Sequence, residues 1–376
     1  MNIAYVYPWD VVGDPSAPER LASLGVDAIA LAASYHSTRA ATPYHPSHRV
    51  LDVPHPALYL PVRPSAWSRL VPASPTWTPA DAYLQARDAL KAAGLPVHAW
   101  TVLTHNSHLG AANPDLVVRN AFGDPYPYAL CPAHEDVLDY CDRLVTEILT
   151  VAAPDGLILE ACGPMGFGHQ SVHEKTSGAD WTALDSDLLS LCFCTSCAPR
   201  YPEPTRARVR EAIDRTTPAA ADLTTVEQVL GPLADEVRTI RVSLSATLRH
   251  RLLATAREIA PDLPLTLHVN PDPWATGAFA ALPEGDPVAD VLVANCWGDP
   301  AQDATRLTRL ADMSTPAQRI GAYVLALPPR PADPAVLADH LRTYAKAGAT
   351  EFHLYHAGLA SPARLTALAE ALRQLA

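Results

Sequence analysis

Short apolar runs recur along the whole chain, and between them lie longer stretches in which apolar residues return with helical spacing. Eight runs are rich in β-branched and aliphatic residues and are almost continuously apolar, as strands buried on both faces require. Intervening stretches such as 79–94, 135–149 and 361–375 predict helices. The predicted strands are residues 2–7, 27–34, 97–103, 155–161, 263–269, 290–295, 319–326 and 351–356.

Eight strand–helix units in series predict an α/β fold, a (β/α)8 TIM barrel formed as one domain by residues 1–376. A doubly wound open sheet is the second interpretation. That fold usually has fewer strands, and the Gly-rich phosphate loop that often follows its first strand is missing here. The connections after strands 2, 3 and 4 are much longer than the usual length of about 2–6 residues, so we expect these loops to carry function.

Composition and charge argue against some classes of protein, namely those that bind nucleic acids or span membranes. The 376 residues are 48% hydrophobic and 18% charged, with a formal net charge of -12, which argues against nucleic acid as a partner. The opening MNIAYVYPWD lacks the basic and apolar regions of a signal peptide, and no apolar run is long enough to span a membrane. We therefore expect a cytoplasmic protein that does not enter a membrane. The oligomeric state, including a homo-oligomer, stays open.

Polar and aromatic residues gather where the predicted strands end, which is the functional face of a (β/α)8 barrel. A single histidine at a strand end is commonly structural, whereas a cluster of such residues indicates a binding site for a polar small molecule. The candidates for ligand contact at this rim are Trp9, Asp10, His36, His105, His268, Asn270, Asn295, Trp297, Tyr355 and His356, and Glu160 ends strand 4.

The loop after strand 4 begins ACGPMGFGHQSVHEKTSG and combines glycines with ionisable residues. His169, His173, Glu174 and Lys175 offer two bases that titrate near neutral pH, a carboxylate and a fixed positive charge. Contacts with a sugar or another polar ligand are one interpretation, and a plain solvated loop is another. A catalytic metal held by the two histidines is a third, although the pattern is not H-E-x-x-H.

Three of the seven cysteines lie in the stretch LCFCTSC, residues 191–197. Thiolates spaced C-x-C-x-x-C can converge on one tetrahedral ion if a fourth ligand comes from elsewhere. Reduced thiols without an ion, or a redox C-x-x-C pair, are the alternatives. An odd number of cysteines without an export signal argues against a disulfide framework.

The run LCFCTSCAPRY resembles the C-Y-C-x-x-C element that follows catalytic strand 4 in family 42 β-galactosidases. The loop before it is similar to segments of bacterial barrel proteins grouped with glycosidases. The resemblance implies that Cys131, in YPYALCPAHEDVLDY, supplies the fourth ligand. It thus implies a structural zinc ion, without an organic cofactor, held by Cys131, Cys192, Cys194 and Cys197.

The same resemblance implies that Glu160 is the general acid/base of a glycoside hydrolase acting on a carbohydrate or glycoside. The chain departs from the family in two places. Leu159 stands where these enzymes usually carry asparagine, and strand 7, RIGAYVLALPPRP, has no carboxylate where they carry the nucleophile. A second carboxylate is still what glycoside cleavage ordinarily requires. Glu174 is the first choice for this role, and the further candidates are Asp10, Asp272 and Asp299.

Two other classes of function stay open at this point. A lyase or isomerase that transfers protons through histidine and lysine would explain the missing carboxylate on strand 7. A sugar-binding barrel without catalysis would explain the aromatic residues at the rim. The fold alone does not decide among these functions, because (β/α)8 barrels support many chemistries.

Overall fold

The computed structural model describes residues 1–168, 173–215, 222–283 and 289–375. Eight parallel strands close into a barrel, because the first strand pairs with both the second and the last. The closure confirms the predicted (β/α)8 barrel and excludes the doubly wound open sheet. In barrel order the strands are β1 (Asn2–Val6), β2 (Ala28–Tyr35), β6 (Val97–Val102), β9 (Gly156–Glu160), β10 (Leu265–Asn270), β12 (Val291–Cys296), β13 (Arg319–Leu325) and β14 (Glu351–Tyr355).

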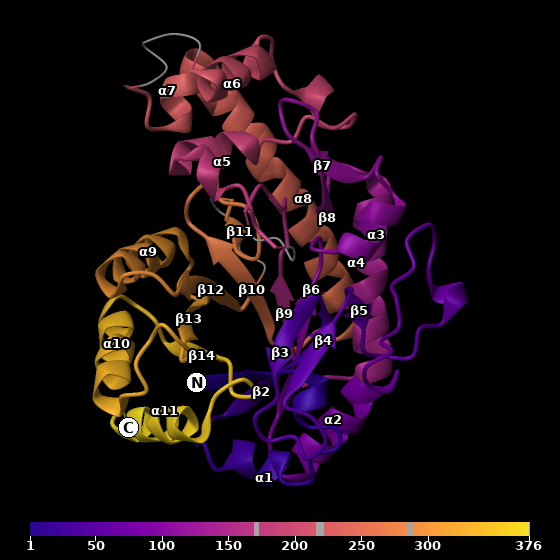
Figure 1. The fold of residues 1–376 in the computed structure, drawn as a ribbon, viewed down its shortest axis with the longest axis vertical. Coiled ribbons are helices and arrows are strands. Elements are labelled where there is room, and N and C mark those ends of the chain that lie inside the picture. Colours follow the sequence, from indigo (N-terminus) through magenta and orange to yellow (C-terminus); the bar gives the residue numbers. More distant parts are fainter. Residues whose placement is uncertain (169–172, 216–221, 284–288, 376) are drawn as a thin grey trace.

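Helices surround the strands, and Figure 1 shows α9, α10 and α11 covering one side of the barrel. The helices α9 and α10 each begin after an aspartate, Asp299 or Asp333, whose side chain accepts backbone N–H groups of the first turn. The connection from β10 to β12 contains the short strand β11 (Ala280–Ala281) and no helix among its described residues. The outer helices are α1 (Ala17–Ala22), α2 (Ala82–Ala92), α4 (Glu135–Glu147), α8 (Ala234–Ile259), α9 (Pro300–Met313), α10 (Pro334–Lys346) and α11 (Pro362–Arg373).

The three long loops predicted after strands 2, 3 and 4 are present and carry secondary structure of their own. In Figure 1 the helices α5, α6 and α7 gather at one end of the molecule, beyond the barrel. The loop after β2 carries β3 (Thr38–Ala41), β4 (Val50–Val53) and β5 (Ala57–Leu58). The loop after β6 carries α3 (Ser107–Ala112), β7 (Val117–Arg119) and β8 (Pro125–Leu130), and the loop after β9 carries α5 (Ala183–Leu189), α6 (Thr205–Asp214) and α7 (Val226–Leu230).

The inside of the barrel contains polar side chains as well as apolar ones. Successive residues of a strand point to opposite faces, so residues two apart share the interior. Tyr5, His98, His268, Glu351 and His353 are all buried. The phenol of Tyr5 contacts rings from two other strands, His268 at 3.0 Å and His353 at 2.9 Å. The interior is therefore a hydrogen-bonded core and not only an aliphatic one. None of the described helices is both long and apolar enough to cross a membrane.

Candidate active site

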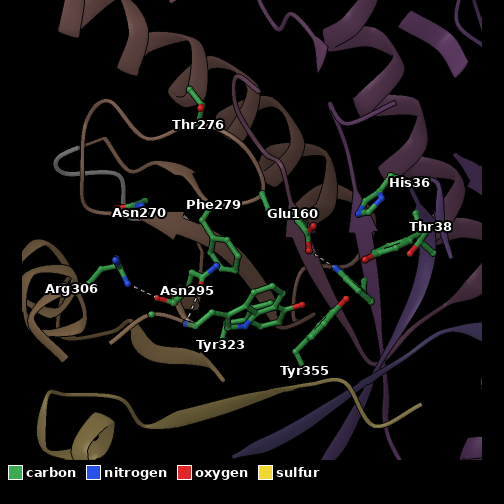
Figure 2. Close-up of a pocket in the computed structure, with 15 residues that line it drawn as sticks. His36, Thr38, Glu160, Asn270, Thr276, Phe279, Asn295, Arg306, Tyr323 and Tyr355 are labelled. Carbon is green, nitrogen blue, oxygen red and sulfur yellow. Dashed lines mark hydrogen bonds between the residues drawn. The ribbon is translucent and has the colours of Figure 1, made fainter. Parts of the chain in front are cut away.

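A cavity of about 540 Å³ opens at the carboxyl ends of the barrel strands (Figure 2). Its walls come from β2, β6, β9, β10, β12, β13 and β14 and from the loops that follow some of them. The lining is rich in aromatic side chains, which come from Tyr35, Trp100, Phe279, Trp297, Tyr323 and Tyr355. Among the described residues of the lining, Glu160 is the one carboxylate and Arg306 the one arginine or lysine.

Glu160 ends β9 and is only 4% exposed. Its Oε2 atom accepts a hydrogen bond of 2.7 Å from the indole Nε1 of Trp100 on the adjacent strand β6. On the other side, Nδ1 of His268 on β10 lies 3.4 Å from the same oxygen. A carboxyl group with a fixed orientation at the edge of an aromatic cavity has the position that a proton donor or acceptor needs.

Three tyrosine hydroxyls meet beside this carboxyl group. The hydroxyl of Tyr7 donates to that of Tyr35 at 3.1 Å and lies 3.4 Å from that of Tyr355. Burial raises the pKa of Tyr35 and of Tyr355 above the usual value, and the negative charge of Glu160 acts in the same direction. These groups are therefore neutral phenols, which suits them to donate hydrogen bonds to a ligand.

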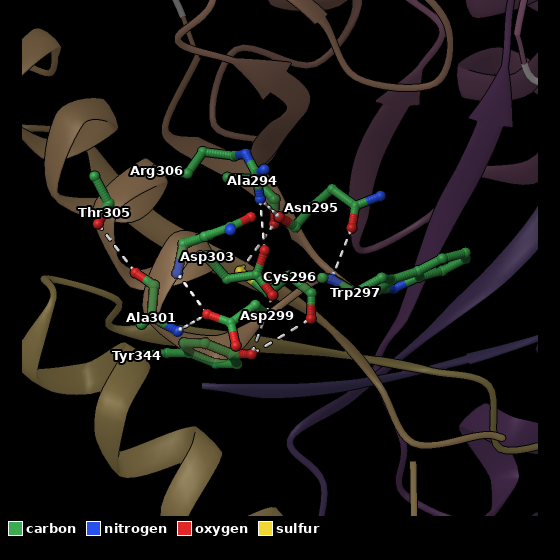
Figure 3. Close-up of polar contacts among 12 residues, drawn as sticks. Ala294, Asn295, Cys296, Trp297, Asp299, Ala301, Asp303, Thr305, Arg306 and Tyr344 are labelled. Carbon is green, nitrogen blue, oxygen red and sulfur yellow. Dashed lines mark hydrogen bonds and ion pairs between the residues drawn. The ribbon is translucent and has the colours of Figure 1, made fainter. Parts of the chain in front are cut away.

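A second network fixes the wall formed after β12 (Figure 3). Arg306 donates from Nη1 to the backbone oxygen of Asn295 at 2.7 Å and forms an ion pair of 2.6 Å with the fully buried Asp303. The Asn295 side chain accepts the backbone N–H of Trp297 at 2.9 Å. The hydroxyl of Tyr344 lies 3.4 Å from Asp303. These contacts hold Trp297, whose ring stacks on Tyr323 with a centroid distance of 5.4 Å.

The structure places the predicted contact residues in three groups. The first lines the cavity and consists of His36, Asn270, Asn295, Trp297 and Tyr355, together with Glu160. The second lies behind that lining and consists of Trp9, Asp10, His105, His268 and His356, all of them buried. The third lies on the loop after β9, where His173, Glu174 and Lys175 are exposed and do not line the cavity. His169 lies outside the described residues.

The second group supports the cavity wall. His356 and Trp9 pack on the ring of Tyr7 with centroid distances of 4.2 and 4.5 Å, and His105 stacks on His36 at 4.4 Å. Burial lowers the pKa of His356 to about 3, so its ring is neutral. Burial also raises the pKa of Asp10 to about 7, although its Oδ2 accepts the backbone N–H of Tyr7 at 2.8 Å.

Glu174, the predicted second carboxylate, forms a hydrogen bond within its own loop. Its side chain accepts the backbone N–H of Thr176, and its contacts with Thr176 lower its pKa. Its catalytic role stays a prediction, as do the roles of the other site residues.

Trp100, Phe279, Tyr323 and Arg306 line the cavity although the sequence analysis did not select them. Trp100 and Tyr323 each lie two residues before the end of a strand, inside an apolar run and not in the loop that follows it. The alternation of side chains along a strand is the signal that could have found both. Arg306 lies inside the helix α9, where nothing in the local sequence marks it as part of a site.

The four cysteines implied as a metal site come together in the structure. The sulfur of Cys131 lies 3.5 Å from that of Cys197 and 3.8 Å from those of Cys192 and Cys194. All four side chains are buried, and their sulfur atoms lie within 4.8 Å of one another. A tetrahedral ion with metal–sulfur bonds of about 2.3 Å requires sulfur–sulfur separations of roughly 3.8 Å. The cluster therefore has the donor set and spacing of a metal site.

Neither a family model nor a curated protein matches the sequence. Solved structures match over 100% of this chain. Their fit is given by TM-scores of 0.56 for α-L-fucosidase isoenzyme 2 from Paenibacillus thiaminolyticus, 0.58 for the catalytic domain of β-amylase from Paenibacillus polymyxa and 0.52 for a catalytic mutant of a GH42 β-galactosidase from G. stearothermophilus.

The identities to these three proteins are 14%, 12% and 9%, so the likeness shows a shared fold. The match covers 49% of the fucosidase chain, 98% of the amylase domain and 56% of the galactosidase chain. This chain thus spans about half the length of two of these neighbours.

Proposed function

We propose that this chain is a catalytic (β/α)8 domain that hydrolyses a glycosidic bond, with Glu160 as the general acid/base. The observation that carries the proposal is the position of Glu160, buried at the end of the fourth barrel strand and bonded to Trp100 in an aromatic cavity. The three structural neighbours named above are a fucosidase, an amylase and a galactosidase, which supports a glycosidic substrate for this chain as well.

The cavity lining suits a sugar. Sugars present apolar C–H faces as well as hydroxyl groups, and the rings of Trp297, Tyr323 and Tyr355 offer flat apolar surfaces for the first of these. The side chains of His36 and Asn270 supply polar groups for the second. A carbohydrate or a small glycoside therefore fits this cavity better than a purely apolar ligand does.

The identity of the second carboxylate is the open question of the mechanism. Glu174 could take this role only if its side chain moved to the cavity, since it is exposed and accepts a hydrogen bond from Thr176. If Glu174 is the nucleophile, Glu174→Gln loses turnover and azide or formate restores it.

A proton-transferring lyase or isomerase is the second candidate. It is favoured by one observation, that Glu160 is the single carboxylate among the described residues of the lining. Analysis of the products separates the two classes. A hydrolase adds one water across the cleaved bond, so its products together gain the mass of one water. A lyase leaves an unsaturated product and an isomerase leaves an isomer of the substrate, each without that gain.

We also propose that the four-cysteine cluster binds zinc and that the ion has a structural role. Four thiolates are a donor set that zinc commonly takes in closed structural sites. Cys131 follows β8, and the other three cysteines follow α5, so the ion would join the loops after β6 and β9. The cysteines are absent from the lining of the cavity, which agrees with a structural ion.

The test of the main proposal is a screen of nitrophenyl glycosides followed by substitution of Glu160. Glu160→Gln should reduce turnover by about 10²- to 10⁴-fold, the usual contribution of a general acid or base. Glu147→Gln is the matched control, because Glu147 is also a buried glutamate but pairs with Arg63 away from the cavity. Near-normal turnover in Glu160→Gln on a confirmed substrate would contradict the proposal.

A further inference from the structure

One end of the cavity offers hydrogen-bond donors and lies away from Glu160. Asn270 is the last residue of β10, and Asn295 is the last but one of the adjacent strand β12. The two strands are paired in a register that places both asparagines at the same level of the barrel. Arg306 reaches the cavity from α9, and Figure 2 shows it apart from Glu160, with Asn295 between them in the view. We call Asn270, Asn295 and Arg306 the donor end of the cavity.

Arg306 has one edge of its guanidinium group unused. Its hydrogen bonds come from Nη1, which donates to the backbone oxygen of Asn295 at 2.7 Å and to Oδ1 of Asp303 at 2.6 Å. Nε and Nη2 make no hydrogen bond within the described part of the chain. The side chain is 32% exposed and lines the cavity. Nε and Nη2 together form a fork that matches the two oxygens of a carboxylate, so one nitrogen fixes the group and the other two are left for a ligand.

The two asparagines add further donors. Oδ1 of Asn295 accepts the backbone N–H of Trp297 at 2.9 Å, and Oδ1 of Asn270 accepts that of Asp272 at 3.0 Å. Neither Nδ2 group donates to another residue that the structure describes. The backbone thus holds both side-chain oxygens, and the NH2 groups are left as donors. An ionised carboxyl group only accepts hydrogen bonds, so it is complementary to these donors.

The charge around Arg306 is also positive. The fully buried Asp303 faces two arginines, Arg306 at 2.6 Å and Arg330 at 3.9 Å. Arg330 also donates to the backbone oxygen of Gly298, which lines the cavity. Asp299 does not line the cavity, and its exposed carboxylate accepts N–H groups of the first turn of α9. Because one buried carboxylate faces two guanidinium groups, a positive charge is in excess beside the cavity even when Asp303 is ionised, and it attracts an anion.

We propose that the donor end binds the carboxylate of an acidic sugar, so that the substrate is a glycoside of a hexuronic acid. The inference rests on the function proposed above for the cleavage of this glycoside, whereas the binding of the acid does not depend on it. The aromatic lining between the donor end and Glu160 is then left for the sugar ring. A carboxylate at the donor end lies away from the carboxyl group of Glu160 and is not repelled by close contact with it.

The first test measures binding without turnover. Isothermal titration at neutral pH compares methyl glucuronide and methyl galacturonide with methyl glucoside and methyl galactoside, each in both anomeric forms. At least one hexuronide should bind about ten-fold or more tightly than the neutral sugar of the same configuration, because a forked pair with a guanidinium group is stronger than a neutral hydrogen bond. The preference should weaken as the salt concentration rises. Equal affinities for the acidic and neutral sugars would overturn the inference.

Substitutions of Arg306 identify the group that reads the acid. Arg306→Lys keeps the charge without the fork, and Arg306→Gln loses both, so the affinity for the hexuronide should fall in that order while the affinity for the neutral sugar changes little. Arg309→Gln is the matched control, because Arg309 is an exposed arginine of the same helix that does not line the cavity. It removes the same charge from the chain and should leave the preference intact.

A second variant tests the donor end if Arg306→Gln does not fold. Asn295→Asp has the same shape, and its oxygen still accepts the backbone N–H of Trp297. The new negative charge replaces a donor and repels a carboxylate. The affinity for the hexuronide should therefore fall to that for the neutral sugar or below it.

The outcomes separate this inference from the proposed function. A folded Arg306→Gln or Asn295→Asp protein that keeps the wild-type preference would overturn the donor end as the site. Tighter binding of a sugar sulfate or a sugar phosphate than of the hexuronides would overturn the assignment of a carboxylate. Preferred binding of a hexuronide by a protein that cleaves no glycoside would support the inference and count against the hydrolase function alone. Cleavage of neutral glycosides in preference to hexuronides would do the reverse.

Discussion

Two contacts of Glu160 come from side chains on the two neighbouring strands. Trp100 on β6 and His268 on β10 both face the oxygen Oε2 of Glu160, one with an N–H donor at 2.7 Å and the other with a ring nitrogen at 3.4 Å. Neither contact is visible in the local sequence, because each joins residues at least 60 positions apart. The pairing of adjacent parallel strands creates both.

At this scale we predict that Trp100→Phe lowers kcat by about 10- to 100-fold and changes KM little. The phenyl ring keeps most of the aromatic wall but removes the N–H donor. Its hydrogen bond gains strength as Glu160 gives up a proton and becomes charged, and a hydrogen bond to a charged group contributes about 1.5–3 kcal/mol. Steady-state kinetics on the substrate found by the glycoside screen checks this.

The companion variant Trp297→Phe should behave differently. Its ring stacks on Tyr323 at the cavity wall and makes no contact with Glu160 among the described interactions, so KM should change more than kcat. Equal effects of the two substitutions on kcat would show that the indole N–H of Trp100 has no special role.

Among the elements, the long loops differ most from what the sequence alone revealed. The spacing of Cys192, Cys194 and Cys197 indicated a cluster, and the resemblance to family 42 added Cys131. The structure brings the four sulfur atoms within 4.8 Å. The hairpin of β7 and β8 that presents Cys131 was not predicted, because its strands are short and pair with each other outside the barrel.

We predict close to one zinc ion per chain when the protein is purified without chelator and analysed by mass spectrometry for metals. Cys194→Ser should lower both the metal content and the thermal midpoint, because structural zinc sites contribute directly to folding. Cys141→Ser is the control, since Cys141 is also buried but lies outside the cluster. A full metal content in Cys194→Ser, or free thiols at all four positions in native protein, would contradict the site.

At the scale of the whole molecule the barrel could be predicted and its interior could not. Near-continuous apolar runs identify strands that are buried on both faces, and eight of them in alternation with helices leave few topologies. The same runs hide the inward-facing polar residues. Tyr5, His268 and His353 each lie within such a run, where a single polar residue reads as an interruption of the pattern. Their hydrogen bonds span more than 260 positions.

Gly358 provides a test of how tightly the loops after β1 and β14 pack against each other. It follows β14, and a Cβ atom at this position would lie 1.8 Å from the buried Oδ2 of Asp10, which follows β1. Gly358→Ala should therefore lower the free energy of unfolding by about 1–3 kcal/mol, the typical cost of overpacking. Urea titration followed by fluorescence measures it.

Gly178→Ala is the control for that substitution, because nothing lies within 4 Å of its added Cβ atom. Equal stability of the two variants would mean that the loops after β1 and β14 adjust freely to each other.

The contacts that fix Trp297 have a consequence for the entropy of binding. Its backbone N–H is held by Asn295, whose carbonyl oxygen is held by Arg306 and, through it, by Asp303. Immobilising a side chain at an interface costs about 0.5–1.5 kcal/mol when it happens on binding. The contacts of Asn295 and Arg306 order the backbone at Trp297 during folding, and stacking on Tyr323 orders its ring, so less of this cost falls on binding. A rigid surface binds a ligand ring of matching shape well and other rings poorly. The selectivity at this wall then depends on the shape of the ligand.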